Sequence, residues 1–110
     1  MDLDNLVVFS FVGIVFVIIG VAMKWKPPKK INSFYGYRTN RSMSSQRMWE
    51  EANRYSAMWM IYVGIFFIFI GFIVAKFVQD IQGLGILVGV FLTVHLLLYV
   101  MVERRLKELE

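Results

Sequence analysis

The stretch "LVVFSFVGIVFVIIGVAM", residues Leu6–Met23, decides the fold class of this chain. It contains 18 residues and no charged side chain. An α-helix rises about 1.5 Å per residue, so this stretch is about long enough to cross a hydrocarbon layer of roughly 30 Å. The sequence therefore predicts a membrane-spanning helix at residues 6–23.

Two further apolar stretches of similar length follow, at residues 57–75 and 84–102. The chain is 58% hydrophobic, above the roughly 45–50% of soluble domains, and its mean hydropathy is +0.61. The remaining segments are too short to bury a separate soluble core. We therefore predict an all-α integral membrane protein whose residues 1–110 form a single membrane domain with three transmembrane helices. The acidic start "MDLDN" differs from the basic start of a secretory signal, so we expect the first helix to remain as an anchor.

The positively charged residues predict the orientation of the chain. Eight of the 12 lysines and arginines lie in residues 24–56, three lie after residue 103, and Lys76 is the remaining one. Positive charge is retained on the cytoplasmic face of a membrane. We expect a multi-pass protein of the cell membrane with its N-terminus outside, and with the basic loop 24–56 and the C-terminus in the cytoplasm.

The net charge of +4 bears on the partners that the chain is expected to have. Cations next to a membrane attract anionic headgroups, so membrane lipids are expected partners. Binding of nucleic acid is not expected, because no fold or aromatic platform typical of it is recognisable.

Glycine pairs in the three spans indicate how helices pack. The pairs are Gly13 and Gly20, Gly64 and Gly71, and Gly85 and Gly89. The first two pairs are spaced by seven residues, which places each pair on one helix face where another backbone can approach. The third pair forms a GxxxG motif, for which packing within the chain and contact with a second copy in a homo-oligomer are alternatives.

His95 is the only ionisable residue inside a predicted span. A polar group at that depth is costly to leave unpaired, so it should face a neighbouring helix or a wet cavity. One hypothesis gives His95 a proton or ligand role. The alternative is a neutral imidazole that holds two helices in register through a bond to a tyrosine or a backbone carbonyl.

The loop after the first span begins with "KWKPPKK", whose prolines end the helix. The next stretch contains Phe34, Tyr35 and Tyr37, which predict packing against the spans or a binding surface. The planar guanidinium of Arg38 is able to clamp a carboxylate or phosphate. The alternatives are an ion pair with a nearby glutamate, Glu50 or Glu51, and a lipid headgroup contact.

A helical pattern starts after this loop. Ser44 is a candidate N-cap, and no proline or glycine interrupts the chain from Ser45 to Val63. We expect a cytoplasmic helix extension that continues into the second span. This extension should bring Trp49 and Asn53 near the loop that carries Arg38.

The stretch "INSFYGYRTNRSMSSQRMWEEAN", residues Ile31–Asn53, resembles the signature of the SdpI/YfhL family of small bacterial membrane proteins. The matching positions are Asn32, Gly36, Tyr37, Arg38, Thr39, Ser44, Trp49 and Asn53. The candidate binding or motif residues are Asn32, Tyr35, Gly36, Tyr37, Arg38, Thr39, Trp49 and Asn53, together with the intramembrane His95. The resemblance implies immunity to a secreted killing peptide that attacks the membrane, with such a toxin peptide as a partner. In the namesake branch it also implies a cytoplasmic regulator held at the membrane.

Three classes of function compete. The first is the immunity protein that the resemblance implies. The second is a small-molecule, lipid or proton-linked transport or binding protein that uses His95 and Arg38. The third, an enzyme, is not expected, because the chain lacks cysteine, HExxH, GxSxG and a phosphate-binding glycine loop, and because the adjacent Glu50 and Glu51 diverge by about 100° on a helix. Neither a cofactor nor a metal site is expected.

Overall fold

The computed structural model describes residues 1–110 and contains three helices and no strand. These are α1 (Leu3–Trp25), α2 (Gln46–Phe77) and α3 (Ile81–Leu109). Each is long and apolar enough to cross a membrane. The predicted all-α membrane class is therefore confirmed, and each predicted span lies inside a longer helix.

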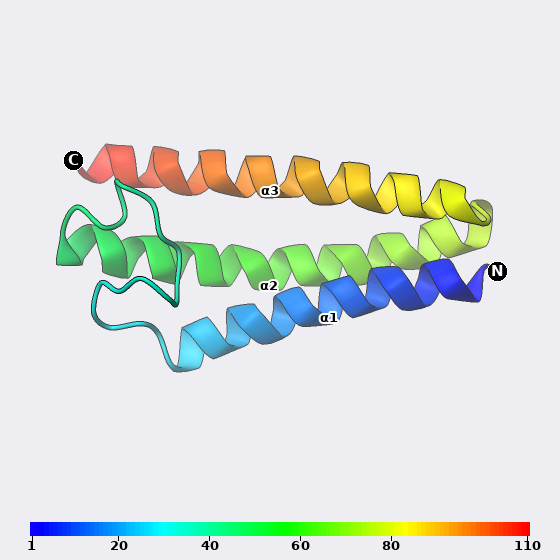
Figure 1. Ribbon diagram of the computed structural model, residues 1–110, viewed down its shortest axis with the longest axis horizontal. Helices are drawn as coiled ribbons and strands as arrows, with labels where there is room; N and C mark the ends of the chain where they lie inside the picture. Colours follow the sequence, from blue (N-terminus) through cyan, green and yellow to red (C-terminus); the bar gives the residue numbers. More distant parts are fainter.

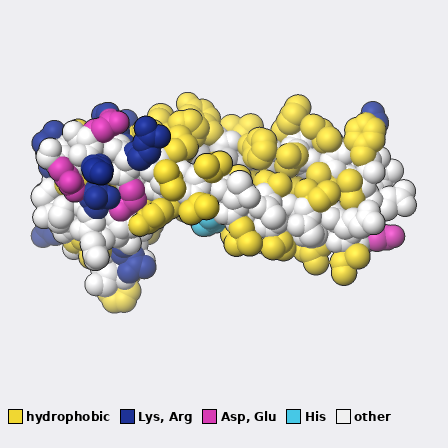
Figure 2. All heavy atoms as spheres, turned by 90° about the horizontal axis from the view of Figure 1, so that it is seen from above, with side chains coloured by type: hydrophobic (Ala, Val, Ile, Leu, Met, Phe, Trp, Pro, Cys, Tyr) yellow, Lys and Arg dark blue, Asp and Glu magenta, His cyan; other side chains and the backbone are white.

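The three helices run side by side along the long axis of the molecule, with α2 between α1 and α3 (Figure 1). The loop between α1 and α2 and the C-terminus lie at one end, and the N-terminus and the α2–α3 turn lie at the other. We call the former the loop end. Charged side chains gather there, whereas hydrophobic side chains dominate the rest of the visible surface (Figure 2). The molecule is 48 Å long, so it extends beyond a hydrocarbon layer of roughly 30 Å.

Helices α1 and α2 pack backbone against backbone along their glycine stripes. A Cβ atom built on Gly13 would lie 2.5 Å from the carbonyl oxygen of Gly64, and one built on Gly20 would lie 2.9 Å from that of Ala57. Helices in a membrane associate through such close van der Waals packing, because lipid supplies no hydrophobic driving force between them. The predicted packing role of the glycine stripes is confirmed.

Helix α3 is attached to α2 near both of its ends. Toward the N-terminal end of the molecule, Leu87 joins a cluster around Phe16 and Phe67, whose rings stack with centroids 5.7 Å apart. At the loop end, Val102 and Leu106 pack against the first turns of α2. Helix α1 diverges from α3 toward the loop end (Figure 1).

Asp2 ties the start of α1 to the turn between α2 and α3. Its carboxylate accepts hydrogen bonds from the backbone N–H groups of Asn5, at 3.0 Å, and Asp80, at 2.8 Å. These two bonds hold the pKa of Asp2 below its usual value. The same side chain therefore caps α1 and fixes its position against the turn.

One expectation needs correction, and one pair of alternatives is narrowed. The N-cap of α2 is Ser45, whose side chain accepts a hydrogen bond from the N–H of Met48 at 3.1 Å, whereas Ser44 donates to the carbonyl of Arg41. Of the two alternatives for Gly85 and Gly89, packing within the chain is not observed, because a Cβ atom at either position would meet nothing within 4 Å, and contact with a second copy is the one that is left. The GxxxG face of α3 is open.

Candidate functional site

Asn32 shapes the beginning of residues 31–45, the part of the signature stretch that precedes α2, which we call the motif loop. Its side-chain oxygen accepts hydrogen bonds from the N–H groups of Phe34, at 2.9 Å, and Tyr35, at 2.7 Å, while its amide nitrogen donates to the carbonyl of Lys30. This is an Asx turn, in which a side chain replaces a backbone partner. Asn32 thus has a local structural role in the loop.

Gly36, Trp49 and Asn53 join the loop to α2. The side chain of Asn53 is buried, and its oxygen accepts from the N–H of Tyr37 at 2.7 Å while its nitrogen donates to the carbonyl of Trp49 at 2.9 Å. Trp49 is also buried and donates its indole N–H to the carbonyl of Pro28. Gly36 has φ 111°, and a Cβ atom there would lie 2.5 Å from the Asn53 side-chain oxygen. Only glycine combines this backbone angle with so close an approach.

Glu103 of α3 binds the other side of the loop. It accepts hydrogen bonds from the hydroxyl groups of Tyr37, at 3.1 Å, and Thr39, at 3.2 Å, and it lies 3.6 Å from the guanidinium of Arg41. Burial, followed by the nearby Glu103 carboxylate, raises the pKa of the Tyr37 phenol above its usual range. The phenol therefore stays neutral and keeps donating to Glu103.

A cavity of about 490 Å³ lies between this loop, α1 and α3. Its lining residues are Phe16, Gly36, Tyr37, Arg38, Thr39, Met60, His95, Leu98 and Tyr99. It therefore brings four consecutive motif residues together with the single histidine of the spans. Its walls are apolar on the membrane side and polar on the loop side, so it has the character of a site for an amphipathic ligand.

His95 lines this cavity and makes no bond to another helix. Its Nδ1 donates to the carbonyl oxygen of Phe91 in the same helix at 3.3 Å, since a carbonyl only accepts. Its ring lies 4.4 Å from that of Phe91 and 5.6 Å from that of Phe16, measured between centroids. The Nε2 atom has no partner in the chain, and in the neutral tautomer that carries its proton on Nδ1 it is an acceptor available to a ligand. A bond that holds two helices in register is not observed.

Arg38 lines the same cavity from the loop. Its guanidinium donates to the carbonyl of Ser33 and forms no ion pair. The two expected carboxylate partners are engaged elsewhere: Glu51 with Arg54 and Arg105, and Glu50 with Gln46. A guanidinium without a carboxylate partner and an unpaired imidazole nitrogen that line the same cavity can hold a ligand that carries an anionic group and a hydrogen-bond donor.

The remaining aromatic residues of the loop do not form one packed surface. Tyr35 donates its hydroxyl to the carbonyl of Lys26 at 3.2 Å, whereas Phe34 is 93% exposed and Trp25 is 81% exposed. Aromatic side chains of this kind lie in the headgroup layer of membrane proteins. Of the candidate residues, Asn32, Tyr35, Trp49 and Asn53 shape the loop, and Gly36, Tyr37, Arg38, Thr39 and His95 line the cavity.

Sequence reasoning missed Glu103 and Tyr99. Glu103 follows the third apolar stretch directly and is separated from Tyr37 by 66 positions, so no local pattern connects the two. Tyr99 lies one turn after His95, and this spacing on a helix was the available signal for a shared face. No three His, Cys, Asp or Glu side chains come together as a metal-ligand group.

Comparison with known proteins agrees with this picture. Residues 29–102, about two thirds of the chain, match the SdpI/YfhL protein family. The chain is also 41% identical over 95 residues to the "Uncharacterized protein YfhL" of Bacillus subtilis (strain 168), an alignment that covers 86% of this chain and 82% of that protein. No solved structure matches the chain. With the motif loop and the third span both inside the matched region, the chain belongs to the SdpI/YfhL family.

Proposed function

We propose that this protein confers immunity to a secreted, membrane-active killing peptide, which it binds in the cavity lined by Arg38 and His95. The observation that carries the proposal is that the motif loop and His95, the single histidine of the chain, line one cavity. A membrane-active peptide is amphipathic, and so are the walls of the cavity. Binding there would withdraw the peptide from the bilayer.

The peptide would meet the cavity from the membrane, between α1 and α3. On this account Phe16 and Leu98 contact apolar side chains of the peptide, while Arg38 binds a carboxylate and His95 Nε2 accepts from a donor. The protein acts by binding and not by catalysis. Its motif loop and C-terminus face the cytoplasm, where the loop would be accessible to a regulator.

A second candidate function is binding or transport of a lipid or small molecule in the same cavity. The observation that favours it is the pair of unpaired polar groups, Arg38 and His95 Nε2, which suits any amphipathic anion. Proton-linked transport has less support, because the spans contain no aspartate, glutamate, lysine, arginine or second histidine to continue a relay.

The test is the survival of a sensitive bacterium exposed to a membrane-active killing peptide. Cells would produce wild-type protein, Arg38→Ala, His95→Leu or the matched control Arg47→Ala, with protein levels equalised by immunoblotting. Arg47 is exposed at the start of α2 and does not line the cavity. We expect protection by wild type and Arg47→Ala, and its loss in Arg38→Ala and His95→Leu.

No protection by wild type against any peptide tested would reject immunity and direct attention to the second candidate. Protection that survives both cavity substitutions would keep immunity but reject the cavity as the site.

A further inference from the structure

A second hollow lies on a different face of the α2–α3 pair and shares no lining residue with the cavity described above. Its volume is about 440 Å³. The lining residues are Arg54, Tyr55 and Met58 of α2, and Met101, Arg104, Arg105 and Glu108 of α3. Three of the seven are arginines, a concentration of positive charge that the proposed immunity function does not use.

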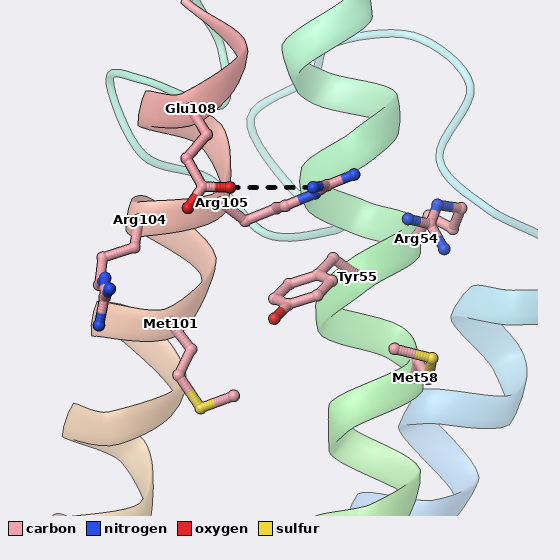
Figure 3. Close-up of a pocket in the computed structure, with 7 residues that line it drawn as sticks. All are labelled: Arg54, Tyr55, Met58, Met101, Arg104, Arg105 and Glu108. Atoms are coloured by element: carbon pink, nitrogen blue, oxygen red, sulfur yellow. Dashed lines mark ion pairs between the residues drawn. The ribbon is translucent and has the colours of Figure 1, made fainter.

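The side chains that line this hollow change from apolar to charged along the two helices. Met58 and Met101 lie on the side of the membrane, and Arg105 and Glu108 lie toward the helix ends (Figure 3). Arg54 and Arg104 flank the hollow on the two helices, with the Tyr55 ring between them. The two methionines belong to the apolar stretches, whereas Arg54 lies shortly before the second stretch and Arg104 and Arg105 lie shortly after the third. The hollow therefore straddles the boundary between hydrocarbon and headgroups.

Ion pairs hold part of this arrangement in place. Glu51 binds Arg54 of its own helix at 2.5 Å and Arg105 of α3 at 3.3 Å, so one carboxylate positions two guanidinium groups from both walls. Arg105 also lies 3.9 Å from Glu108. Arg104 has neither a hydrogen bond nor an ion pair in the chain, so its charge is free for a ligand.

We propose that this hollow binds the phosphate of an anionic phospholipid, with Arg104 as the main contact. The lipid's acyl chains would continue past Met58 and Met101 into the hydrocarbon. Charge complementarity favours an anionic over a zwitterionic headgroup, and basic pockets between membrane helices are suited to such lipids. Arginine provides the planar donor set that a phosphate accepts. The proposal does not depend on immunity or on the cavity that holds His95.

The test is native mass spectrometry of the full-length protein, purified in neutral detergent micelles. The protein would be mixed with equal amounts of phosphatidylglycerol and phosphatidylcholine that carry identical acyl chains, and the ratio of the two bound lipids would be measured. Arg104→Gln removes the free cation. Lys107→Gln is the matched control, since Lys107 is an exposed cation of the same helix that forms no ion pair and does not line the hollow.

We expect wild type and Lys107→Gln to retain phosphatidylglycerol preferentially, and Arg104→Gln to lose about fivefold of this preference, as expected for one headgroup contact. Equal retention of the two lipids by wild type would overturn the proposal. An equal loss in both variants would also overturn it, because the attraction would then belong to surface charge in general. Displacement of phosphatidylglycerol by inorganic phosphate at matched concentration would assign the hollow to free phosphate instead.

Discussion

The motif residues divide by what each side chain does. Asn53 has a structural role, because its buried amide uses both its oxygen and its nitrogen in hydrogen bonds to the backbone. Aspartate would lose the donor and bury a charge, and leucine would leave the N–H of Tyr37 without its acceptor. Arg38 is instead a candidate binding residue, since it lines a cavity and has no carboxylate partner.

Gly36→Ala should destabilise the protein. The added Cβ atom meets the Asn53 oxygen at 2.5 Å, and alanine is strained at φ 111°, so we expect a loss of about 1–3 kcal/mol in the free energy of unfolding. Thermal unfolding in detergent would measure it. Gly85→Ala is the control and should not lower the melting temperature, because its Cβ atom meets nothing. Equal melting temperatures for wild type and Gly36→Ala would refute this.

The stability of the protein should fall at alkaline pH through Tyr37. The pKa of Tyr37 in the folded protein lies above the ordinary tyrosine value of 10.0, so the folded state holds this proton more tightly than the unfolded state does. The contribution is therefore fully present below about pH 10 and is lost as the pH rises through the folded pKa.

Tyr37→Phe tests this pH dependence. We expect the variant to melt at lower temperature than wild type at neutral pH, with a difference that narrows as the pH is raised above about 10. Melting curves of both proteins over this range provide the measurement. A difference that stays constant with pH would show that the tyrosine proton plays no part.

At the scale of the elements, α1 and α2 form a tight pair, and α3 is held more loosely. In the apolar 18-residue segment of α3, 11% of the residues are buried, compared with 28% in the corresponding segment of each of the other two helices. The cavity lies where α1 and α3 diverge, and the motif loop is held to α2 through Asn53 and to α3 through Glu103. A ligand can therefore enter without separating α1 from α2.

Gly64→Ala should weaken the α1–α2 pair. Its Cβ atom would lie 2.5 Å from the carbonyl oxygen of Gly13, and a backbone atom cannot move aside as a flexible side chain does. We expect a loss of about 1–3 kcal/mol in stability, read from thermal unfolding and from protein abundance in cells. Gly89→Ala, on the open face of α3, should leave both unchanged. A similar effect of the two substitutions would contradict the assignment of faces.

The sequence was sufficient to predict the elements, because long apolar runs and heptad glycines depend on local spacing. It was insufficient where a choice depended on neighbours distant in the chain. A GxxxG pair has the same sequence whether it faces a helix of its own chain or the outside, so the sequence left both alternatives open for Gly85 and Gly89. Arg38 and His95 line one cavity, and Glu103 accepts hydrogen bonds from the loop, because of the path that the loop takes. No periodicity encodes that path.

At the scale of the whole molecule, the two ends differ in their content of basic residues. The loop and the C-terminus share one end with nearly all basic residues, and the N-terminus lies at the other (Figure 1, Figure 2). Two ligand sites are proposed, the cavity between α1, α3 and the loop and the hollow between α2 and α3. Both lie toward the loop end, where they would be filled from the same leaflet.

The orientation can be tested with single cysteines, because the chain has none of its own. We expect a membrane-impermeant maleimide to label Leu3→Cys in intact cells and to leave Lys107→Cys unlabelled, since positive charge stays in the cytoplasm. Lys107→Cys should react once the cells are opened. Labelling of Lys107→Cys alone in intact cells would invert the proposed orientation.

The most direct test of the central claim is ligand protection at the cavity. Thr39→Cys lines the cavity, whereas the neighbouring Asn40→Cys is exposed and does not. The rate of maleimide labelling would be measured for both, in lipid nanodiscs, with and without a killing peptide against which the survival assay has shown protection. We predict that the peptide slows labelling of Thr39→Cys several-fold and leaves Asn40→Cys unchanged. Unchanged labelling at Thr39→Cys under saturating peptide would contradict the assignment of this cavity as the binding site.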